Sequence, residues 1–373
     1  MPKVYKKLSQ EVYFAFADAV TCLGSGKELR QAIYKDKIGL MRANALFSNA
    51  PHIGEGLIGG LLQVNPNKSR VEQIFDLLIG EENQKLLKLC DQVALASALG
   101  DLDSPHPGRF DISLTKKLEN QNLCPVFQLS NACSSGTDAL ALAYGMIREG
   151  YADAIGVIAI DCLDLTKLIQ HIDLGTQSRE HAKPFSIDRS GTSFGEGGGF
   201  VILANEKKLK QTQLTPLARV AGAGMSCDAQ DLILPDTSGY FPSLAIAMAL
   251  ENSGLKPEEI DYINAHGSGT LANDQAEAKA FTRIFGDHLK NMGISGTKGA
   301  IGHLLGATGL VEAIILAWAI FDQKAPGTAG FTSKDPSLNL NIIEKSKAMR
   351  IKNGLSVTLG FGGVNSCLAL SHI

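Results

Sequence analysis

The sequence lacks several features that mark large classes of protein. Its seven cysteines are widely spaced and form no Cys-x-x-Cys pair, which argues against a disulfide scaffold and against a structural zinc site. The formal net charge is only -3 and no long Lys/Arg block occurs, so no positive field for nucleic acid is expected. Short basic clusters at 207–210 and 345–352 are interpreted as solvated faces, although an acidic carrier protein could use them.

Long apolar runs are also missing. The first residues, MPKVYKKLSQEVYF, have neither the apolar core nor the small-residue cleavage site of a signal peptide. The longest apolar stretch, at 313–321, is far shorter than the roughly 20 residues that span a bilayer. We therefore expect a cytoplasmic protein without a membrane span, in a reducing compartment that suits its cysteines.

Glycine, by contrast, is abundant at 39 residues and gathers where strand patterns meet helix patterns. An apolar segment at 124–129 predicts a buried strand, and continuous apolar runs at 154–160 and 198–203 predict strands covered on both faces. The Ala- and Leu-rich segment 137–148 predicts a helix, ended by Gly150.

A second series of elements follows a polar segment at 209–214 that could join two halves. It contains predicted strands at 218–222, 260–264, 355–359 and 367–371 and predicted helices at 243–252, 275–285 and 306–321. Strands that alternate with helices in both series predict an α/β fold. We divide it into an N-terminal half, residues 1–210, and a C-terminal half, residues 211–373.

The first third of the chain, residues 1–122, is the least informative. Residues 54–62 are rich in glycine, and the apolar spacing at 72–98 predicts a helix. The segment 101–109, DLDSPHPGR, predicts a loop because it is rich in Asp, Pro and Gly.

One cysteine has surroundings that suit a nucleophile. Cys133 lies between the predicted strand 124–129 and the predicted helix 137–148, where a helix dipole and free backbone N–H groups favour a thiolate. The Ser-Ser-Gly that follows it keeps the turn small, so a substrate can approach. A buried structural cysteine is the alternative, and the other six cysteines keep that interpretation.

A nucleophile needs partners, and two histidines have suitable settings. His266 ends a predicted strand and precedes a Gly-Ser-Gly turn, and His303 lies between glycines just before the long helix at 306–321. Either histidine alone could be structural, but together with Cys133 they indicate one catalytic site. A Gly-x-Ser-x-Gly sequence at 191–195 leads into a predicted strand rather than a helix, which argues against a serine hydrolase.

Several separate motifs, in the same order, resemble those of the β-ketoacyl synthases of the thiolase superfamily. They are the cysteine turn at 131–139, KPFSIDRSGTSFGEGGG at 183–199, NAHGSGTLANDQAEA at 264–278, TKGAIGHLLGATGLVEA at 297–313 and GFGGVN at 360–365. The likeness covers residues 123–373 well and residues 1–122 poorly, and the usual early strand-and-glycine opening is barely visible at 12–24. These departures indicate a divergent member of the family.

The resemblance implies a thiolase-like, five-layer α-β-α-β-α fold built from two related halves. It implies that Cys133 holds an acyl group taken from an acyl carrier protein. His266 and His303 then stabilise the enolate formed when a malonyl carrier loses carbon dioxide, and the backbone N–H groups of Cys133 and Phe361 hold the oxyanion of the condensation. The expected activity is that of a β-ketoacyl-acyl carrier protein synthase in fatty acid or polyketide biosynthesis.

Supporting residues also follow from the resemblance. Lys298 and Glu312 are expected to form a charge pair near the histidines, with a plain structural salt bridge as the alternative. Asp274 is expected to organise the loop after His266, and Phe361 to gate the site or simply to pack in the core. No cofactor or metal is implied.

The partners implied are an acyl carrier protein and a second synthase subunit, identical or related. One alternative is a chain-length-factor-like subunit without its own condensing activity. Another is a thiolase-like or decarboxylating enzyme that performs no condensation.

Overall fold

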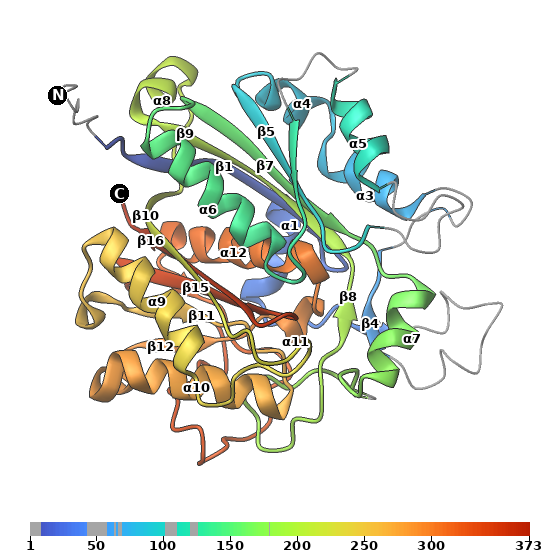
Figure 1. The fold of residues 1–373 in the computed structure, drawn as a ribbon, viewed down its shortest axis with the longest axis vertical. Helices are drawn as coiled ribbons and strands as arrows, with labels where there is room; N and C mark the ends of the chain where they lie inside the picture. The colour runs from blue at the N-terminus through green and yellow to red at the C-terminus, as the bar shows by residue number, and fades with distance from the viewer. Residues whose placement is uncertain are drawn as a thin grey trace.

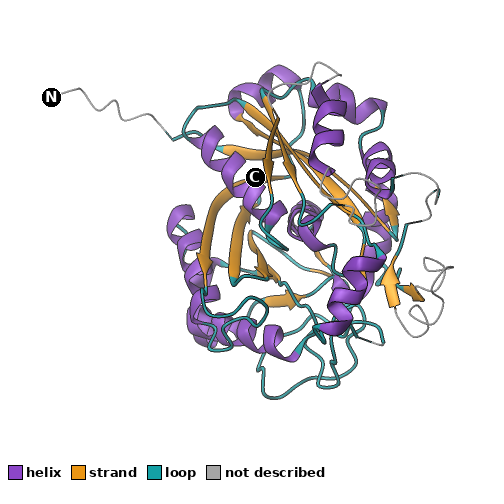
Figure 2. Ribbon diagram, turned by 45° about the vertical axis from the view of Figure 1, so that its right-hand side comes forward, coloured by secondary structure: helices purple, strands orange, loops and turns teal. Residues whose placement is uncertain are grey.

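One large mixed sheet runs through the molecule, and helices cover it on both faces (Figures 1 and 2). The computed structural model describes residues 9–42, 58–62, 65, 69–100, 110–119, 126–178 and 180–373. In spatial order, the N-terminal half of the sheet contains β1 (Val12–Thr21), β9 (Gly197–Asn205), β7 (Ala154–Asp161), β5 (Gln92–Ala96) and β6 (Val126–Leu129). The C-terminal half contains β10 (Ala218–Cys227), β16 (Val364–Ser371), β15 (Asn353–Gly360), β11 (Tyr262–Asn264) and β12 (Gly293–Ser295).

The two halves repeat one pairing pattern. Strand β1 is antiparallel to β9, β9 is antiparallel to β7, and β7, β5 and β6 are parallel to one another. Strands β10, β16, β15, β11 and β12 follow the same sequence of two antiparallel and two parallel pairings. The halves meet where β1 pairs with β10 over three residues. This repetition confirms the predicted α/β fold of two related halves.

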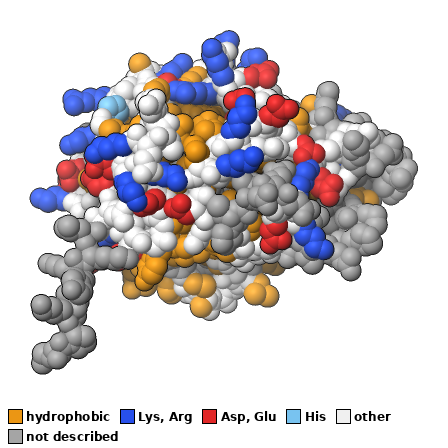
Figure 3. Space-filling view, turned by 90° about the horizontal axis from the view of Figure 1, so that it is seen from above, with side chains coloured by type: hydrophobic (Ala, Val, Ile, Leu, Met, Phe, Trp, Pro, Cys, Tyr) orange, Lys and Arg blue, Asp and Glu red, His pale blue; other side chains and the backbone are white. Residues whose placement is uncertain are grey.

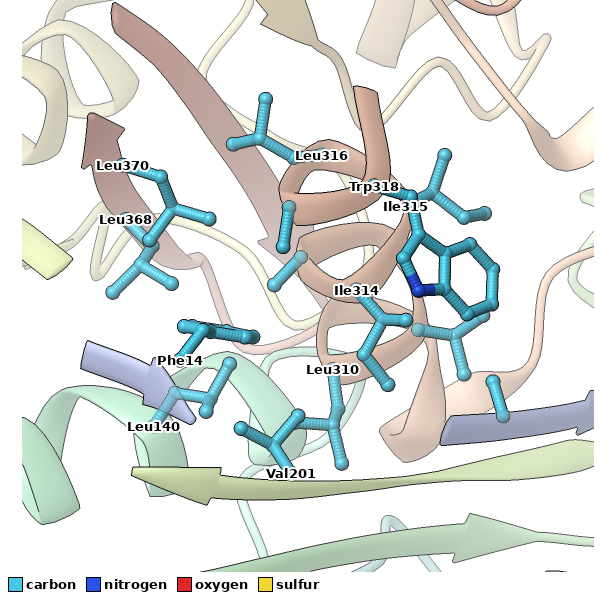
Figure 4. Packing of buried hydrophobic residues seen from close by; sticks show 14 of the residues in the cluster. Phe14, Leu140, Val201, Leu310, Ile314, Ile315, Leu316, Trp318, Leu368 and Leu370 are labelled. Carbon is cyan, nitrogen blue, oxygen red and sulfur yellow. The ribbon is translucent and has the colours of Figure 1, made fainter. Parts of the chain in front are cut away.

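Two central helices, α6 (Ser135–Arg148) and α12 (Thr308–Asp322), lie between the halves of the sheet (Figure 1). Leu310 and Ile314 of α12 pack in one cluster with Val201 of the N-terminal half and Leu368 of the C-terminal half (Figure 4). Because α12 is surrounded by protein, nearly all of its residues are apolar, and its Glu312 is buried as well. The segment Leu305–Asp322 is apolar and long enough to cross a membrane, but 89% of it is buried inside the fold, as in a core helix.

Outer helices complete five α-β-α-β-α layers. Helices α3 (Arg70–Leu78) and α5 (Phe110–Glu119) cover the N-terminal half of the sheet, and α9 (Tyr240–Ser253) and α10 (Leu271–Phe285) cover the C-terminal half. Along β9, Val201 and Leu203 face the central helices, whereas Phe200 and Ile202 face the outer ones. Strands covered on both faces therefore read as continuous apolar runs.

The structure contains further helices, strands and turns. They are α1 (Gly26–Tyr34), α4 (Glu81–Leu87), α7 (Leu165–Asp173), α8 (Glu206–Thr212), α11 (Lys298–Ile301), β2 (Gly24–Ser25), β3 (Met41–Arg42), β4 (Ile58–Gly60), β8 (Phe194–Gly195), β13 (Lys324–Ala325) and β14 (Lys347–Ala348), with 3-10 turns at Pro257–Glu259, Gly286–Lys290 and Leu305–Ala307.

Seen from above, Lys and Arg side chains are interspersed with Asp and Glu, which matches the small net charge (Figure 3).

Two interpretations of the first third are corrected by the structure. The single helix predicted at 72–98 is wrong: α3 and α4 are followed by β5, a parallel strand between β7 and β6. Its continuous apolar run fits a helix and a doubly covered strand equally well, so spacing alone could not separate them. The opening that is barely visible at 12–24 is in fact β1, a central strand of the sheet, followed by β2.

The junction between the halves also differs from the expected polar connection, because its first part is helix α8. The predicted boundary at residue 210 falls inside α8 and stays a prediction. The loop predicted at 101–109 and the first four residues of the glycine-rich 54–62 segment lie outside the described residues.

Candidate active site

The close crossing of α6 and α12 positions the candidate site. A Cβ atom at Gly136 would lie 2.8 Å from the backbone nitrogen of Leu310, and one at Gly309 would lie 1.9 Å from Oγ1 of Thr137. Glycine at both positions therefore permits the contact between the helices. Since Cys133 precedes α6 and His303 precedes α12, the crossing brings both residues to one region.

The turns that enter these two helices share an unusual backbone conformation. Ala132, with φ 49°, and Leu305, with φ 52°, both adopt the left-handed region that is uncommon for residues with a side chain. Each lies three residues before the first residue of its helix. The two turns are therefore equivalent features of the two halves.

Cys133 is buried, with 7% of its surface exposed. Burial raises the pKa of its thiol to about 11; the backbone N–H of Phe361, the charge of Lys298 and its own N–H oppose this, whereas the charge of Asp161 adds to it. At neutral pH the side chain is therefore mainly a thiol. The backbone N–H groups of Cys133 and Phe361 lie close enough to the sulfur to lower the pKa of the thiol, and donors in this position suit an oxyanion that forms beside it.

A glycine-rich turn brings Phe361 to the cysteine. The turn Gly360–Gly363 joins β15 to β16, and Gly362 and Gly363 have φ values of 81° and 75°. A Cβ atom at Gly360 would lie 3.4 Å from the backbone nitrogen of Cys133. Residues without a side chain thus allow the turn to lie against the start of α6.

His266 follows β11 and is held by Lys298. The Nζ atom of Lys298 donates to the carbonyl of His266 and lies 3.2 Å from Nδ1 of the same residue. An ammonium group can only donate, so Nδ1 accepts and the ring proton is on Nε2. Burial, followed by the charges of Lys298 and His303, holds the pKa of His266 well below its usual range, so the ring is neutral.

His303 carries its proton on the same nitrogen. The backbone N–H of Leu305 donates to Nδ1 at 3.0 Å, and the Thr308 hydroxyl lies 2.9 Å from Nδ1. Burial, and then the charge of Lys298, keeps the pKa of this ring well below its usual range. The rings of His266 and His303 are 5.2 Å apart, so the site presents two neutral Nε2–H donors.

Lys298 and Glu312 form the expected ion pair, with Nζ 2.7 Å from Oε1. Burial raises the pKa of Glu312 to about 7, against the lowering effect of Lys298. Because Lys298 contacts both Glu312 and His266, the pair directly orients an imidazole of the site.

Asp274, on α10, lies under the loop that follows His266. Its carboxylate accepts hydrogen bonds from the N–H of Gly269 at 3.1 Å and from the N–H of Phe185 at 2.7 Å. Arg189 lies 3.6 Å away. Burial raises the pKa of Asp274, while these donors oppose the shift. The contacts join the loop to the segment around Phe185.

Sequence reasoning missed Glu277, which contacts His266 more directly than Asp274 does. Its carboxylate accepts the N–H of His266 at 2.7 Å and the N–H of Gly267 at 2.8 Å. Burial and the neighbouring Asp274 raise the pKa of Glu277 to about 8. The sequence could have indicated this role. Glu277 lies three residues after Asp274 and therefore on the same face of the helix.

The sequence analysis did not select His171 either. In the structure its ring stacks on Phe194 at 3.9 Å, and Phe194 stacks on His303 at 5.5 Å. His171 also lies 5.6 Å from the ring of Phe361. No local sequence motif predicts where His171 lies, because its location depends on how α7 packs against β8.

Comparisons with known proteins point to one family. Residues 123–208 match the model described as Beta-ketoacyl synthase, N-terminal domain, and residues 217–332 match Beta-ketoacyl synthase, C-terminal domain. The 3-oxoacyl-[acyl-carrier-protein] synthase 2 of Synechocystis sp. is 30% identical over 375 residues, covering 98% of this chain and 82% of that protein.

Two further matches cover different shares of the chain. Nodulation protein E of Rhizobium leguminosarum bv. trifolii is 36% identical over 250 residues, covering 67% of this chain and 62% of that protein. The match thus spans less than two thirds of the relative's length. A solved structure of a type II PKS acyl-carrier protein in complex with its ketosynthase, bound to the hexaketide, contains a similar chain. It has a TM-score of 0.87 and 24% identity, covers 98% of this chain and 100% of that chain, and shows the shared fold.

Proposed function

The chain belongs to the β-ketoacyl synthase family, and from this premise we propose that it condenses an acyl group held on Cys133 with a malonyl unit delivered by an acyl carrier protein. The observation that carries the proposal is the pair of neutral imidazoles, both protonated on Nε2, together with a buried thiol; Lys298 holds His266, and its charge also lowers the pKa of Cys133. Two N–H donors without positive charge suit an oxygen that becomes an enolate.

The first half-reaction loads the enzyme. The Cys133 sulfur attacks the carbonyl carbon of an acyl-carrier thioester, a new C–S bond forms, and the carrier's C–S bond breaks. The thiol proton of Cys133 is transferred to the departing carrier thiol, so no net proton is released. The N–H groups of Cys133 and Phe361 receive the transient oxyanion, since both lie near the sulfur and lower the pKa of the thiol.

The second half-reaction makes the new carbon–carbon bond. The thioester oxygen of a malonyl carrier accepts hydrogen bonds from Nε2 of His266 and of His303. As the carboxylate leaves as carbon dioxide, its bonding electrons move into the enolate that these donors stabilise. The enolate carbon attacks the acyl carbonyl, and collapse of the adduct breaks the C–S bond to Cys133. The sulfur leaves as a thiolate and takes a proton from water to return to the resting thiol. No cofactor is required by these steps.

Four other residues support the histidines in this proposal. Lys298, held by Glu312, fixes the tautomer of His266, and Asp274 and Glu277 fix the backbone around it. Phe361 has two proposed roles. Its ring would move aside to admit the acyl chain, and its backbone N–H would donate to the oxyanion. A chain-length-factor-like role is not favoured, since the thiol and both imidazoles are present together.

We also propose two partners for this chain. The type II PKS ketosynthase was solved with its acyl-carrier protein, and an acyl carrier protein is the proposed partner here as well. A second synthase subunit, identical or related, is the other proposed partner. Such a carrier-dependent reaction would take place in the cytoplasm.

The test is a condensation assay with the full chain. Acyl-carrier and malonyl-carrier thioesters of defined length are mixed with the protein, and the carrier products are weighed by mass spectrometry. We expect a 3-oxoacyl product two carbons longer from the wild type and from Cys227→Ala, an exposed-cysteine control, and none from Cys133→Ala. Equal product from Cys133→Ala would refute the proposal.

A further inference from the structure

A buried ion pair at the end of β7 has no part in the chemistry described so far. Asp161 is the last residue of β7, Lys167 lies in the first turn of α7, and neither side chain is exposed. The Nζ atom of Lys167 lies 3.9 Å from Oδ1 of Asp161 and 3.0 Å from Oδ2 of Asp164. Buried ion pairs often stabilise a fold no better than apolar residues would, so this pair is expected to serve a further purpose.

The carboxylate of Asp161 joins two loops. Its Oδ2 atom accepts the backbone N–H of Ala98 and the backbone N–H of Gly306, both at 2.8 Å, and its Oδ1 atom accepts the hydroxyl of Ser97 at 2.9 Å. A Cβ atom at Gly306 would lie 2.3 Å from the backbone nitrogen of Ala98, so the loops touch beside the carboxylate. Burial raises the pKa of Asp161, while Lys167 and the three donors oppose the rise.

The first of these loops holds the segment that leads to the thiol. The backbone N–H of Ser97 donates to the carbonyl of Leu129 at 3.3 Å, and the hydroxyl of Ser130 donates to the carbonyl of Ala98 at 2.8 Å. Leu129 and Ser130 directly precede the turn that contains Cys133. The carboxylate at the end of β7 is also near enough to the thiol for its charge to raise the pKa of Cys133.

The second loop holds one of the two imidazoles. Leu305, the residue before Gly306, has a φ of 52°, and its N–H donates to Nδ1 of His303 at 3.0 Å. A residue with a side chain keeps such a conformation only where the surrounding contacts hold it. By binding the N–H of Gly306, Asp161 fixes the peptide that follows Leu305, and so supports the donor that sets the tautomer of His303.

We propose that Asp161, with Lys167 as its counter-ion, is a positioning residue that keeps Cys133 and His303 at the separation that condensation requires. The inference rests on the proposed function, because it concerns how the acyl group on Cys133 meets the enolate. Decarboxylation needs only the malonyl carrier and the histidines, whereas bond formation also needs the acyl carbon within reach. A displacement of about 1 Å can slow such a positioned reaction roughly 100-fold.

Loss of the carboxylate should therefore uncouple the two steps. An enolate that does not reach the acyl carbon takes a proton from water at the carbon that lost carbon dioxide, and it leaves as an acetyl carrier. The hydroxide that remains combines with the carbon dioxide, so one malonyl carrier and one water give one acetyl carrier and one bicarbonate. The ratio of acetyl carrier to 3-oxoacyl carrier measures this uncoupling.

The test measures that ratio with the full chain. Acyl-carrier and malonyl-carrier thioesters are mixed with the protein, and both products are weighed in one mass spectrum. We expect Asp161→Ala to raise the ratio about ten- to hundredfold above the wild type. Asp161→Asn keeps an oxygen that can accept the N–H groups of Ala98 and Gly306, so it should return the ratio most of the way to the wild-type value.

A matched control removes a similar carboxylate elsewhere. The Oδ2 atom of Asp91 also accepts two backbone N–H groups, those of Asp153 and Ala154, but at the opposite end of β7. Asp91→Ala should therefore leave the ratio unchanged. Because both products come from one preparation, a partly misfolded variant lowers them together and the ratio still reports positioning.

The outcomes separate this inference from the function on which it rests. If Asp161→Ala does not fold, the double variant Asp161→Leu/Lys167→Met replaces the buried pair by apolar residues of similar size and should raise the ratio in its place. An unchanged ratio in the folded variant, or an equal rise in Asp91→Ala, overturns the inference alone. Absence of any 3-oxoacyl carrier from the wild type overturns the proposed function as well.

Discussion

At the scale of single residues, burial sets the protonation state of the candidate site. It raises the pKa of Cys133 to about 11 and holds the pKa values of His266 and His303 well below their usual range. The resting site therefore holds a thiol and two neutral imidazoles rather than a thiolate–imidazolium pair. This state suits donors that must receive negative charge only when the malonyl carrier decarboxylates.

The raised pKa of Cys133 predicts how the thiol reacts with alkylating reagents. Only the thiolate reacts, and its fraction grows with pH until the pKa is passed. Iodoacetamide labelling of the Cys133 peptide should therefore accelerate about tenfold per pH unit from pH 7 upward and still be rising at about pH 10. The exposed Cys227, followed by mass spectrometry in the same digest, reports how the reagent behaves at an accessible thiol. A plateau for Cys133 below pH 9 would contradict the burial argument.

At the scale of elements, the crossing of α6 and α12 determines where the reactive residues lie. The two helices touch at Gly136 and Gly309, and the turns before them contain Cys133 and His303. A side chain at the crossing would push the turns apart as well as strain the core. Stability and activity should therefore fall together when this contact is altered.

Gly309→Ala tests the crossing. Its new methyl group would lie 1.9 Å from Oγ1 of Thr137, an overpacking expected to cost about 1–3 kcal/mol of unfolding free energy. Adding Thr137→Ala should recover part of the loss, because it removes the clashing hydroxyl. Gly145→Ala, on α6 but with nothing within 4 Å of the new methyl, should instead stabilise by about 0.5–1 kcal/mol. Denaturant unfolding measures all three; equal effects of the two glycine variants would show that the crossing is not tightly packed.

At the scale of the whole molecule, the repeated pairing pattern explains how residues far apart in sequence share a site. The N-terminal half supplies Cys133, and the C-terminal half supplies His266, His303 and Phe361. The halves are joined through the short β1–β10 ladder and through the central helices. The site therefore depends on the packing of both halves.

Much of this architecture could be predicted from the sequence. Strands β7 and β9 read as apolar runs and α12 as a long apolar helix, because full burial on all sides leaves no polar face to confuse the pattern. Motif spacing was enough to select Cys133, His266 and His303 as candidates. Where these signals were strong, the predicted elements lie within a few residues of the observed ones.

The rest depended on tertiary contacts. Strand β5 was assigned to a helix, since a short apolar run does not reveal its partners. Glu277 and His171 were missed because their importance comes from what they touch, namely the backbone of His266 and the rings of Phe194 and Phe361. Such contacts cannot be read from local composition.

The most direct test of the account is carbon dioxide release from a malonyl carrier by His266→Ala and His303→Ala, with the exposed His372→Ala as control. Each active-site variant should still acquire an acyl group on Cys133 but lose about 10²–10³-fold in decarboxylation rate, as expected when one oxyanion donor is removed. The control should match the wild type. Undiminished release from either histidine variant would contradict the claim that these two neutral imidazoles stabilise the enolate.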